Sequence, residues 1–150
     1  MKRIARSLGV LVVFGIVACG GRSEGAPASS SAAPPASGIP KVEIAFLNHP
    51  PVISALTEAD RLLVSYGDQI EIIRYDLETD QGAAFAKSKR LTGHFPIAIF
   101  INGASDIKLK DRTVKFFSFP QGTGTFMVAS GSWTVDDLRQ AIDQSLSRAK

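Results

Sequence analysis

Few side chains in this 150-residue sequence could carry redox or metal chemistry: one cysteine, Cys19, and two histidines, His49 and His94. A single thiol cannot form an intramolecular disulfide, a redox pair or a multi-cysteine metal site. The two imidazoles could bind Cu or Zn incompletely, with water or a carboxylate as a third ligand, or respond to pH as a pair. Alternatively, each is a polar loop residue, because a dedicated metal site usually offers three or more ligands.

The cysteine follows a segment with the pattern of a secretory signal peptide. Residues 1–18 combine a basic start with an apolar run at residues 8–18. This run is too short to span a bilayer, which needs about 20 apolar residues. Its end, Ile16-Val17-Ala18-Cys19, resembles the bacterial lipobox. That resemblance implies cleavage before Cys19, a diacylglyceryl thioether on its sulfur and usually a third acyl chain on its amine.

A lipidated Cys19 predicts a protein of the bacterial cell envelope, held on a membrane by its acyl chains and facing the periplasm. Two or more acyl chains give stable anchoring, since each buried methylene contributes about 0.8 kcal/mol. Gly20 is not the aspartate that retains many enterobacterial lipoproteins at the inner membrane, which slightly favours the outer membrane. The membrane is therefore the first expected partner.

Residues 19–38 are expected to form a tether between the lipid and a folded domain. From Gly20 to Gly38, 17 of 19 residues are Gly, Ala, Ser or Pro, so this stretch cannot bury enough apolar surface to fold. As a flexible coil it spans about 24 Å. The net charge of +3 includes three basic residues of the signal segment. Without them basic and acidic residues balance, so no nucleic-acid partner is indicated.

Residues 39–150 are expected to form one α/β domain, because strand and helix patterns alternate along them. Apolar runs predict strands at three segments: 41–47, 70–75 and 97–101, the last ending in the turn signal Asn102-Gly103. Three- and four-residue spacing predicts helices at 52–63 and 79–91, the second burying Ala84, Phe85, Ser88 and Leu91. A hairpin follows at 106–109 and 113–119, and then a strand at 125–129.

The C-terminal segment predicts an amphipathic helix with a defined start. Thr134 can cap it, Asp137 lies three residues on as the capping-box partner, and Trp133 can pack on Leu138 as a hydrophobic staple. The positions that repeat at helical spacing are expected to be buried: Leu138, Ala141, Ile142, Ser145 and Leu146.

Basic residues cluster in the expected hairpin: Lys108, Lys110, Arg112 and Lys115. Such charges most often solvate a face of the protein, or protect an edge strand from pairing with other chains. The alternative is a contact with anionic lipid headgroups near the tether.

The element order resembles the thioredoxin fold over residues 41–148: a β-α-β-α half, a proline leading into a core strand that ends in Asn-Gly, further antiparallel strands and a closing helix. Pro96 in Gly-His-Phe-Pro-Ile-Ala-Ile-Phe-Ile matches the family's cis-proline. The segment Asn48-His49-Pro50-Pro51-Val52 occupies the slot of the Trp-Cys-Gly-Pro-Cys loop. His49 then replaces the first cysteine, Val52 the second, and Pro51 matches the loop proline. The resemblance implies a three-layer α/β/α sandwich with a mixed central sheet.

The missing cysteines decide what the resemblance implies about function. Thiol–disulfide exchange needs a thiolate, which this domain lacks, so we expect no oxidoreductase, isomerase or peroxidase activity, no cofactor and no enzyme. The family's client-binding surface remains, formed here by six residues in two facing loops: His49, Pro50, Pro51, His94, Phe95 and Pro96. It implies a groove that binds an envelope protein or peptide.

Three functions stay open at this stage. The first is a redox-inactive binding or assembly module that uses the Phe95–Pro96 face. The second is a metal-binding accessory protein that holds Cu or Zn through His49 and His94. The third is a structural subunit that binds through the hairpin at 106–119. Pro96 also has a purely structural explanation, because the geometry of the turn alone can require a proline there.

Overall fold

The computed structural model describes residues 38–123 and 131–149. Its elements, in chain order, are β1 (Lys41–Phe46), α1 (Pro50–Ser65), the short 3-10 turn η1 (Gly67–Gln69), β2 (Glu71–Asp76), α2 (Asp80–Ser88), β3 (Ile97–Ile101), β4 (Asp106–Lys108), β5 (Thr113–Lys115) and α3 (Val135–Ala149). The signal segment, Cys19, the tether up to residue 37 and the strand expected at 125–129 lie outside the described residues.

β1 is the central strand of a three-stranded mixed sheet with the order β2-β1-β3. It runs parallel to β2, with Ile44 opposite Arg74, and antiparallel to β3, with Ile44 opposite Ile99. An antiparallel bridge between Ala98 and Phe117 continues the pairing beyond β3. β4 and β5 form the expected hairpin as a separate two-stranded sheet. A mixed sheet with three helices confirms the expected α/β class.

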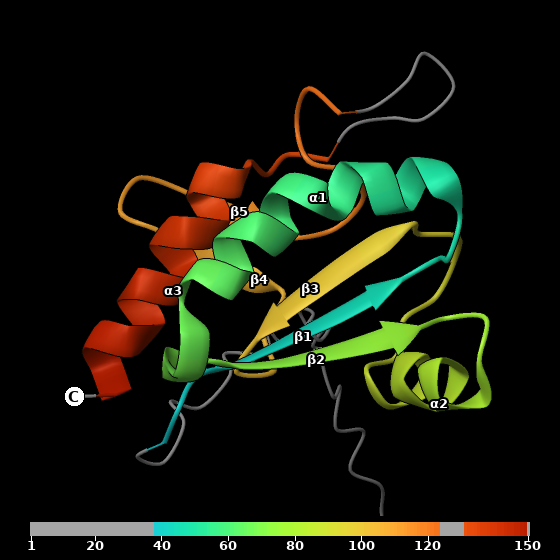
Figure 1. Ribbon diagram of the computed structural model, residues 1–150, viewed down its shortest axis with the longest axis horizontal. Helices are drawn as coiled ribbons and strands as arrows, with labels where there is room; N and C mark the ends of the chain where they lie inside the picture. The colour runs from blue at the N-terminus through green and yellow to red at the C-terminus, as the bar shows by residue number, and fades with distance from the viewer. Residues whose placement is uncertain (1–37, 124–130, 150) are drawn as a thin grey trace, which may run out of the picture.

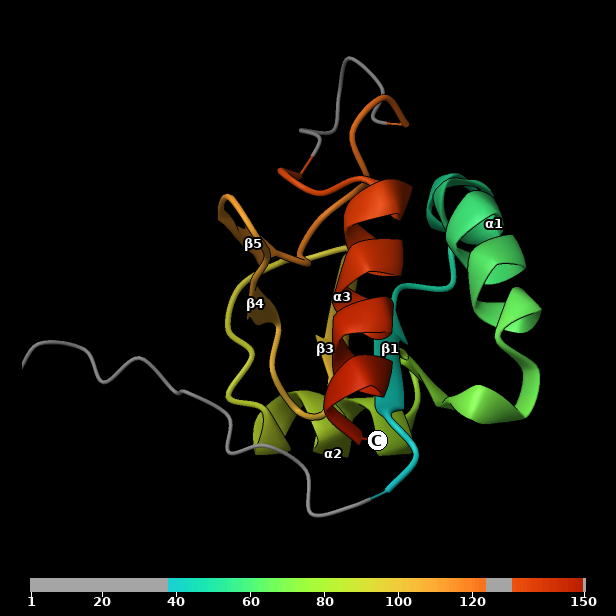
Figure 2. The same ribbon diagram turned by 90° about the vertical axis from the view of Figure 1, so that its left-hand side faces the viewer.

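Different helices cover the two faces of the sheet, because successive side chains of β1 and β3 point to opposite sides. One face of the two strands packs into the main core with α1 and α3 through Val42, Ile44, Ile97, Ile99 and Ile101. The other face packs against Phe85 of α2 through Ala45, Ala98 and Phe100. Figures 1 and 2 show α1 and α3 on one side of the sheet and α2 on the other.

α1 begins at Pro50 and Pro51, whose fixed φ and missing N–H suit the first positions of a helix. Its apolar face is buried at the expected spacing, by Val52, Ala55, Leu56, Ala59, Leu62 and Leu63. Within residues 38–123 and 131–149, no helix has both the length and the apolar character needed to cross a membrane.

α2 buries a different face from the one that the sequence predicts. Ala84 and Ser88 are exposed, and the buried residues are Phe85, as expected, and Gly82. Leu91 is half-buried but lies beyond the helix, which ends at Ser88. The prediction was wrong because it relied on the spacing of residues along the helix. The face that is buried is set instead by the close contact of Gly82 with the backbone of Asp76.

Gly82 brings α2 into contact with the end of β2. A Cβ built on Gly82 would lie 1.8 Å from the carbonyl oxygen of Asp76, a separation that no side chain tolerates. The N–H of Gly82 donates to the Oγ1 of Thr79, which caps the helix, at 3.1 Å. Only glycine therefore allows this helix to pack so closely on the strand.

A buried ion pair lies between the sheet and α2. Glu43 of β1 is only 7% exposed, and its Oε2 lies 2.6 Å from the Nζ of Lys89. Lys41 approaches the other carboxylate oxygen at 3.7 Å. The Lys89 ammonium also lies 5.1 Å and 4.8 Å from the ring centres of Phe85 and Phe100. A charged pair thus replaces apolar packing at this end of the α2 layer.

α3 begins as predicted and is tied to the hairpin at the same point. The N–H of Asp137 donates to the Oγ1 of Thr134 at 3.1 Å, and the N–H of Thr134 donates to the Oδ2 of Asp137 at 2.8 Å. The Nη2 of Arg112 donates to both Asp137 oxygens, at 2.8 and 2.7 Å. Trp133 and Leu138 are fully buried in the main core, and the rest of the expected face is buried at Ala141, Ile142 and Ser145 and half-buried at Leu146.

Tyr66, the residue after α1, joins α1 to α3. Its hydroxyl donates to the Oδ1 of Asp143 at 2.8 Å. Burial is the main reason that the pKa of Tyr66 is raised to about 12, and the hydrogen bond and negative charge of Asp143 add to it. Arg139 acts in the opposite direction.

We predict that Lys89→Met lowers the free energy of unfolding by about 3 kcal/mol, because it leaves the buried Glu43 carboxylate without its closest partner. The double variant Glu43→Gln/Lys89→Met should recover most of this loss, since both charges are then absent. Urea unfolding measures both effects. Lys87→Met on the same helix is the control, because Lys87 is exposed and forms no ion pair with a described residue. Equal losses for the Lys87 and Lys89 variants would contradict the prediction.

We predict that the free energy of unfolding falls as pH rises from about 10 to about 12, in part because of Tyr66. In this window the unfolded chain loses the Tyr66 proton while the folded chain keeps it, so the stabilisation present below pH 10 disappears. Tyr66→Phe should remove that part of the slope in urea unfolding. A constant difference between wild type and Tyr66→Phe across the window would refute the assignment.

Candidate functional site: the loops at one end of the sheet

The two loops singled out in the sequence are neighbours in the fold. β1 ends and β3 begins at the same end of the sheet, with Phe46 opposite Ile97. One residue further out, the N–H of Leu47 donates to the carbonyl oxygen of Pro96 at 3.0 Å. Figure 1 shows this end beside the first turn of α1. The antiparallel pairing of β1 with β3 therefore brings Leu47, at the start of the segment 47–51, next to Pro96, at the end of the segment 93–96.

His49 occupies the N-cap position of α1 in an extended conformation, with φ −111° and ψ 145°. Its carbonyl oxygen accepts from the N–H groups of Val52 and Ile53 at 2.9 and 3.0 Å, while its imidazole makes no capping bond. The Nε2 lies 3.6 Å from the Oε1 of Glu78, and 56% of the His49 side chain is exposed. His49 is thus fixed through its backbone and accessible through its ring.

A third loop, residues 76–79, completes this end of the sheet, and the sequence analysis missed it. Besides Glu78 beside His49, Asp76 accepts a hydrogen bond on its Oδ2 from the Nδ2 of Asn48 at 3.1 Å. The sequence contained a signal for this loop, because its acidic residues come at the end of the second expected strand. That strand, β2, is parallel to β1, and parallel neighbouring strands end on the same side of a sheet. We call residues 47–51, 76–79 and 93–96 the loop face.

Phe95 contributes to the loop face both an apolar ring and backbone groups that are unpaired within residues 38–123 and 131–149. Its ring is half-buried and lies 6.0 Å, centre to centre, from the ring of Phe117. Neither the N–H nor the carbonyl of Phe95 forms a backbone hydrogen bond with a residue that the structure describes. Beyond it, β3 is paired on both sides, with β1 and with the segment around Phe117. Phe95 therefore lies just before the paired part of β3, and its own backbone groups are not paired with any described residue.

The histidines are held differently from each other. His49 is paired with Glu78, whereas His94 is exposed and forms no hydrogen bond or ion pair with the described part of the chain. Among residues 38–123 and 131–149, no group of three or more His, Cys, Asp or Glu side chains could hold a metal ion. The partner that the structure gives to His49 is therefore a carboxylate.

The position at which the resemblance puts the second cysteine is an ordinary core position. Val52 is 4% exposed and packs in the main core beneath the first turn of α1. Because the only cysteine of the chain is Cys19, the loop face contains no thiol that could attack a disulfide. What it offers is hydrogen bonding and apolar contact.

The hairpin, the third candidate surface, is built into the body of the domain. Val114, Phe116 and Phe119 are buried in the main core, and Arg112 is bound by Asp137. Phe117 is half-buried between the rings of Phe95 and Phe100. The apolar residues of this segment are therefore used in folding, and its outward surface is polar.

Comparisons of this chain with protein-family models, with curated proteins and with solved structures found no match. The geometry of the loop face is therefore the basis for the function proposed below.

Proposed function

We propose that this protein is a lipid-anchored protein of the bacterial cell envelope whose thioredoxin-like domain binds an extended segment of a partner protein at the loop face, without redox chemistry. The single observation that carries the proposal is the backbone of Phe95, which no described residue pairs with, beside its half-buried ring. An extended peptide recognises such a place by pairing with the free N–H and carbonyl and placing a side chain against the ring.

The element order supports the thioredoxin-like assignment. A strand, a helix, a parallel strand and a second helix precede an antiparallel strand, and a helix closes the domain. The strand order β2-β1-β3 and the helices on both faces agree with it. The bridge between Ala98 and Phe117 adds a further antiparallel segment after β3, as that fold would have.

The surroundings of Phe95 support reversible binding. Pro50 and Pro51 are exposed at the start of α1, so a rigid apolar surface lies in the loop that neighbours Pro96. The imidazole of His49 and the carboxylate of Glu78, which belongs to the third loop, supply a hydrogen-bond donor and an acceptor. With no thiol at this place, a bound segment would be held only by noncovalent contacts.

A photocrosslinking phenylalanine analogue at position 49 tests this binding in intact cells. We expect it to form a discrete adduct with an envelope protein, and the same analogue at Val64 to form none, because Val64 is 72% exposed on α1 but outside the loop face. Adding Phe95→Ala should weaken the adduct, since truncating an aromatic anchor typically lowers affinity about 30-fold.

Val64→Ala is the matched control for Phe95→Ala, and thermal unfolding checks that both variants remain folded. Adducts of the same size and yield from positions 49 and 64 would indicate nonspecific capture. An adduct from position 49 that survives Phe95→Ala unchanged would refute the role of Phe95.

Lipid anchoring is tested separately, through the sulfur of Cys19. We predict that cells given an alkyne-bearing fatty acid label the wild-type chain and that Cys19→Ser abolishes this label, because serine cannot form the thioether. Gly20→Ser, which leaves the thiol in place, is the control and should keep the label. Persistence of the label in Cys19→Ser would overturn the assignment.

A further inference from the structure

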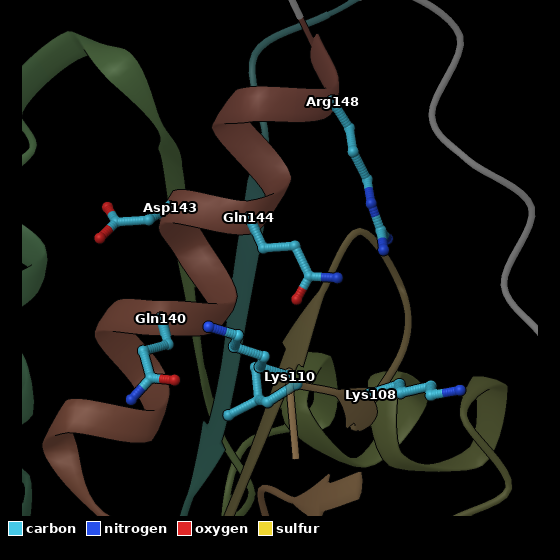
Figure 3. Close-up of a pocket in the computed structure, with 7 residues that line it drawn as sticks. Lys108, Lys110, Gln140, Asp143, Gln144 and Arg148 are labelled. Carbon is cyan, nitrogen blue, oxygen red and sulfur yellow. The ribbon is translucent and has the colours of Figure 1, made fainter. Parts of the chain in front are cut away.

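An open cavity of about 550 Å³ lies between the hairpin and α3, away from the loop face. Lys108 and Lys110 line it from the hairpin side, and Gln140, Gln144 and Arg148 line it from α3. Figure 3 shows the side chains of Lys110 and Gln144 approaching each other across this cavity and Arg148 reaching toward the hairpin. The lining is thus rich in hydrogen-bond donors.

In the structure, some basic residues of the hairpin cluster contact a partner side chain and others form no ion pair with a described residue. Arg112 is bound by Asp137, and Lys115 lies 4.9 Å from the ring centre of Phe117. Lys108 and Lys110 form no ion pair with any residue of the described chain, and they are joined by Arg148, for which the same holds. Three cationic side chains that form no ion pair with a described residue therefore line the same cavity.

The one acidic residue of the lining does not compensate for these cations. Asp143 is turned toward α1, where its Oδ1 accepts the hydrogen bond of the Tyr66 hydroxyl. Figure 3 shows its carboxylate on the opposite side of α3 from the lysines. An anion that enters the cavity would consequently meet positive charge and amide groups.

The cavity lies on the side of the domain at which the N-terminal segment enters. Lys41, the first residue of β1, donates its N–H to the Oδ1 of Asn102 at 2.9 Å, and Asn102 in turn donates to Ser145 of α3. Figure 2 shows the beginning of β1 next to the C-terminal turn of α3, which carries Arg148. The loop face lies at the other end of β1, a distance of about 20 Å for a six-residue strand.

We propose that this cavity binds the phosphate of anionic lipid headgroups in the membrane that holds the protein, so that the loop face points away from that membrane. The inference rests on the proposed lipid anchor for the nearness of the membrane. Lysine and arginine side chains bind phosphate oxygens through charge-assisted hydrogen bonds. The expected flexible tether, with a span of about 24 Å, would leave the orientation of the domain free, and the docked cations would fix it.

The test uses the lipidated protein reconstituted in vesicles, with phosphatidylcholine alone or with added phosphatidylglycerol. Modification of lysines by an amine-reactive reagent, followed by mass spectrometry, measures whether Lys108 and Lys110 are covered. We expect their labelling to slow at least fivefold in the anionic vesicles and that of Lys87 on α2 to stay unchanged. Arg148→Glu should weaken docking by at least about fivefold and restore labelling, whereas Lys87→Glu, with the same charge change, should not.

Several results would overturn the inference. Equal labelling of Lys108 and Lys110 in the two kinds of vesicle would show that no headgroup covers them. The same protection by inorganic phosphate in neutral vesicles would assign the cavity to free phosphate. Equal loss of protection in the Arg148 and Lys87 variants would reduce the effect to overall charge.

Flotation with the neutral vesicles reports on the lipid anchor alone. A chain that fails to float with them yet shows slower labelling with anionic vesicles would refute the anchor and support the cavity. A chain that floats but shows no difference in labelling would support the anchor and refute the cavity.

Discussion

The pairing of β1 with a parallel strand on one side and an antiparallel strand on the other is the constraint on which the rest of the structure depends. Because β1 and β3 are buried on both faces, a shift of one residue in register would exchange the residues that face α1 and α3 with those that face α2. Ile44 packs in the main core with α1 and α3, whereas the smaller Ala45 packs in the second cluster with Phe85 of α2. The same pairing separates two ends of the sheet: the chain enters β1 at one end, and the loop face lies at the other.

Much of this arrangement could be predicted from the sequence, because it depends on local patterns. The strands β1, β2 and β3, the turn at Asn102-Gly103, the prolines that start α1 and the capping box of α3 all come from short-range rules, and the structure has each of them. The burial of α2 depends instead on how closely Gly82 approaches the carbonyl of Asp76, a contact that no periodicity reveals. The sequence analysis named the two proline-containing loops of the candidate site, and the structure places them as neighbours. It missed the acidic third loop, because that contribution follows from the parallel pairing of β2.

The ion pairs were the feature hardest to predict from the sequence, because the partner of each buried carboxylate lies far away in the chain and is adjacent only in the folded structure. Glu43 is in the middle of an apolar strand and binds Lys89, which directly follows α2 and lies 46 residues further along the chain. Asp137 caps its own helix and also binds Arg112 of the hairpin. The second pair removes Arg112 from the basic cluster of the hairpin. The cations that remain, Lys108 and Lys110, are therefore defined by which of their neighbours the fold has already neutralised.

The proposed binding has no covalent step and needs another source of affinity, which the proposed tethering would supply. Pairing with the few free backbone groups beside Phe95 gives a small contact, and the affinity of such a contact is modest. With the proposed lipid anchor, a partner on the same membrane would meet the loop face at an effective concentration of roughly millimolar order when the linker length matches the separation. Docking through the cavity would raise this value further, because it removes orientations in which the loop face points toward the lipid. In the proposed function, the absence of cysteines from the domain and the membrane tether are complementary: without a thiol the binding is reversible, and tethering would make weak binding sufficient.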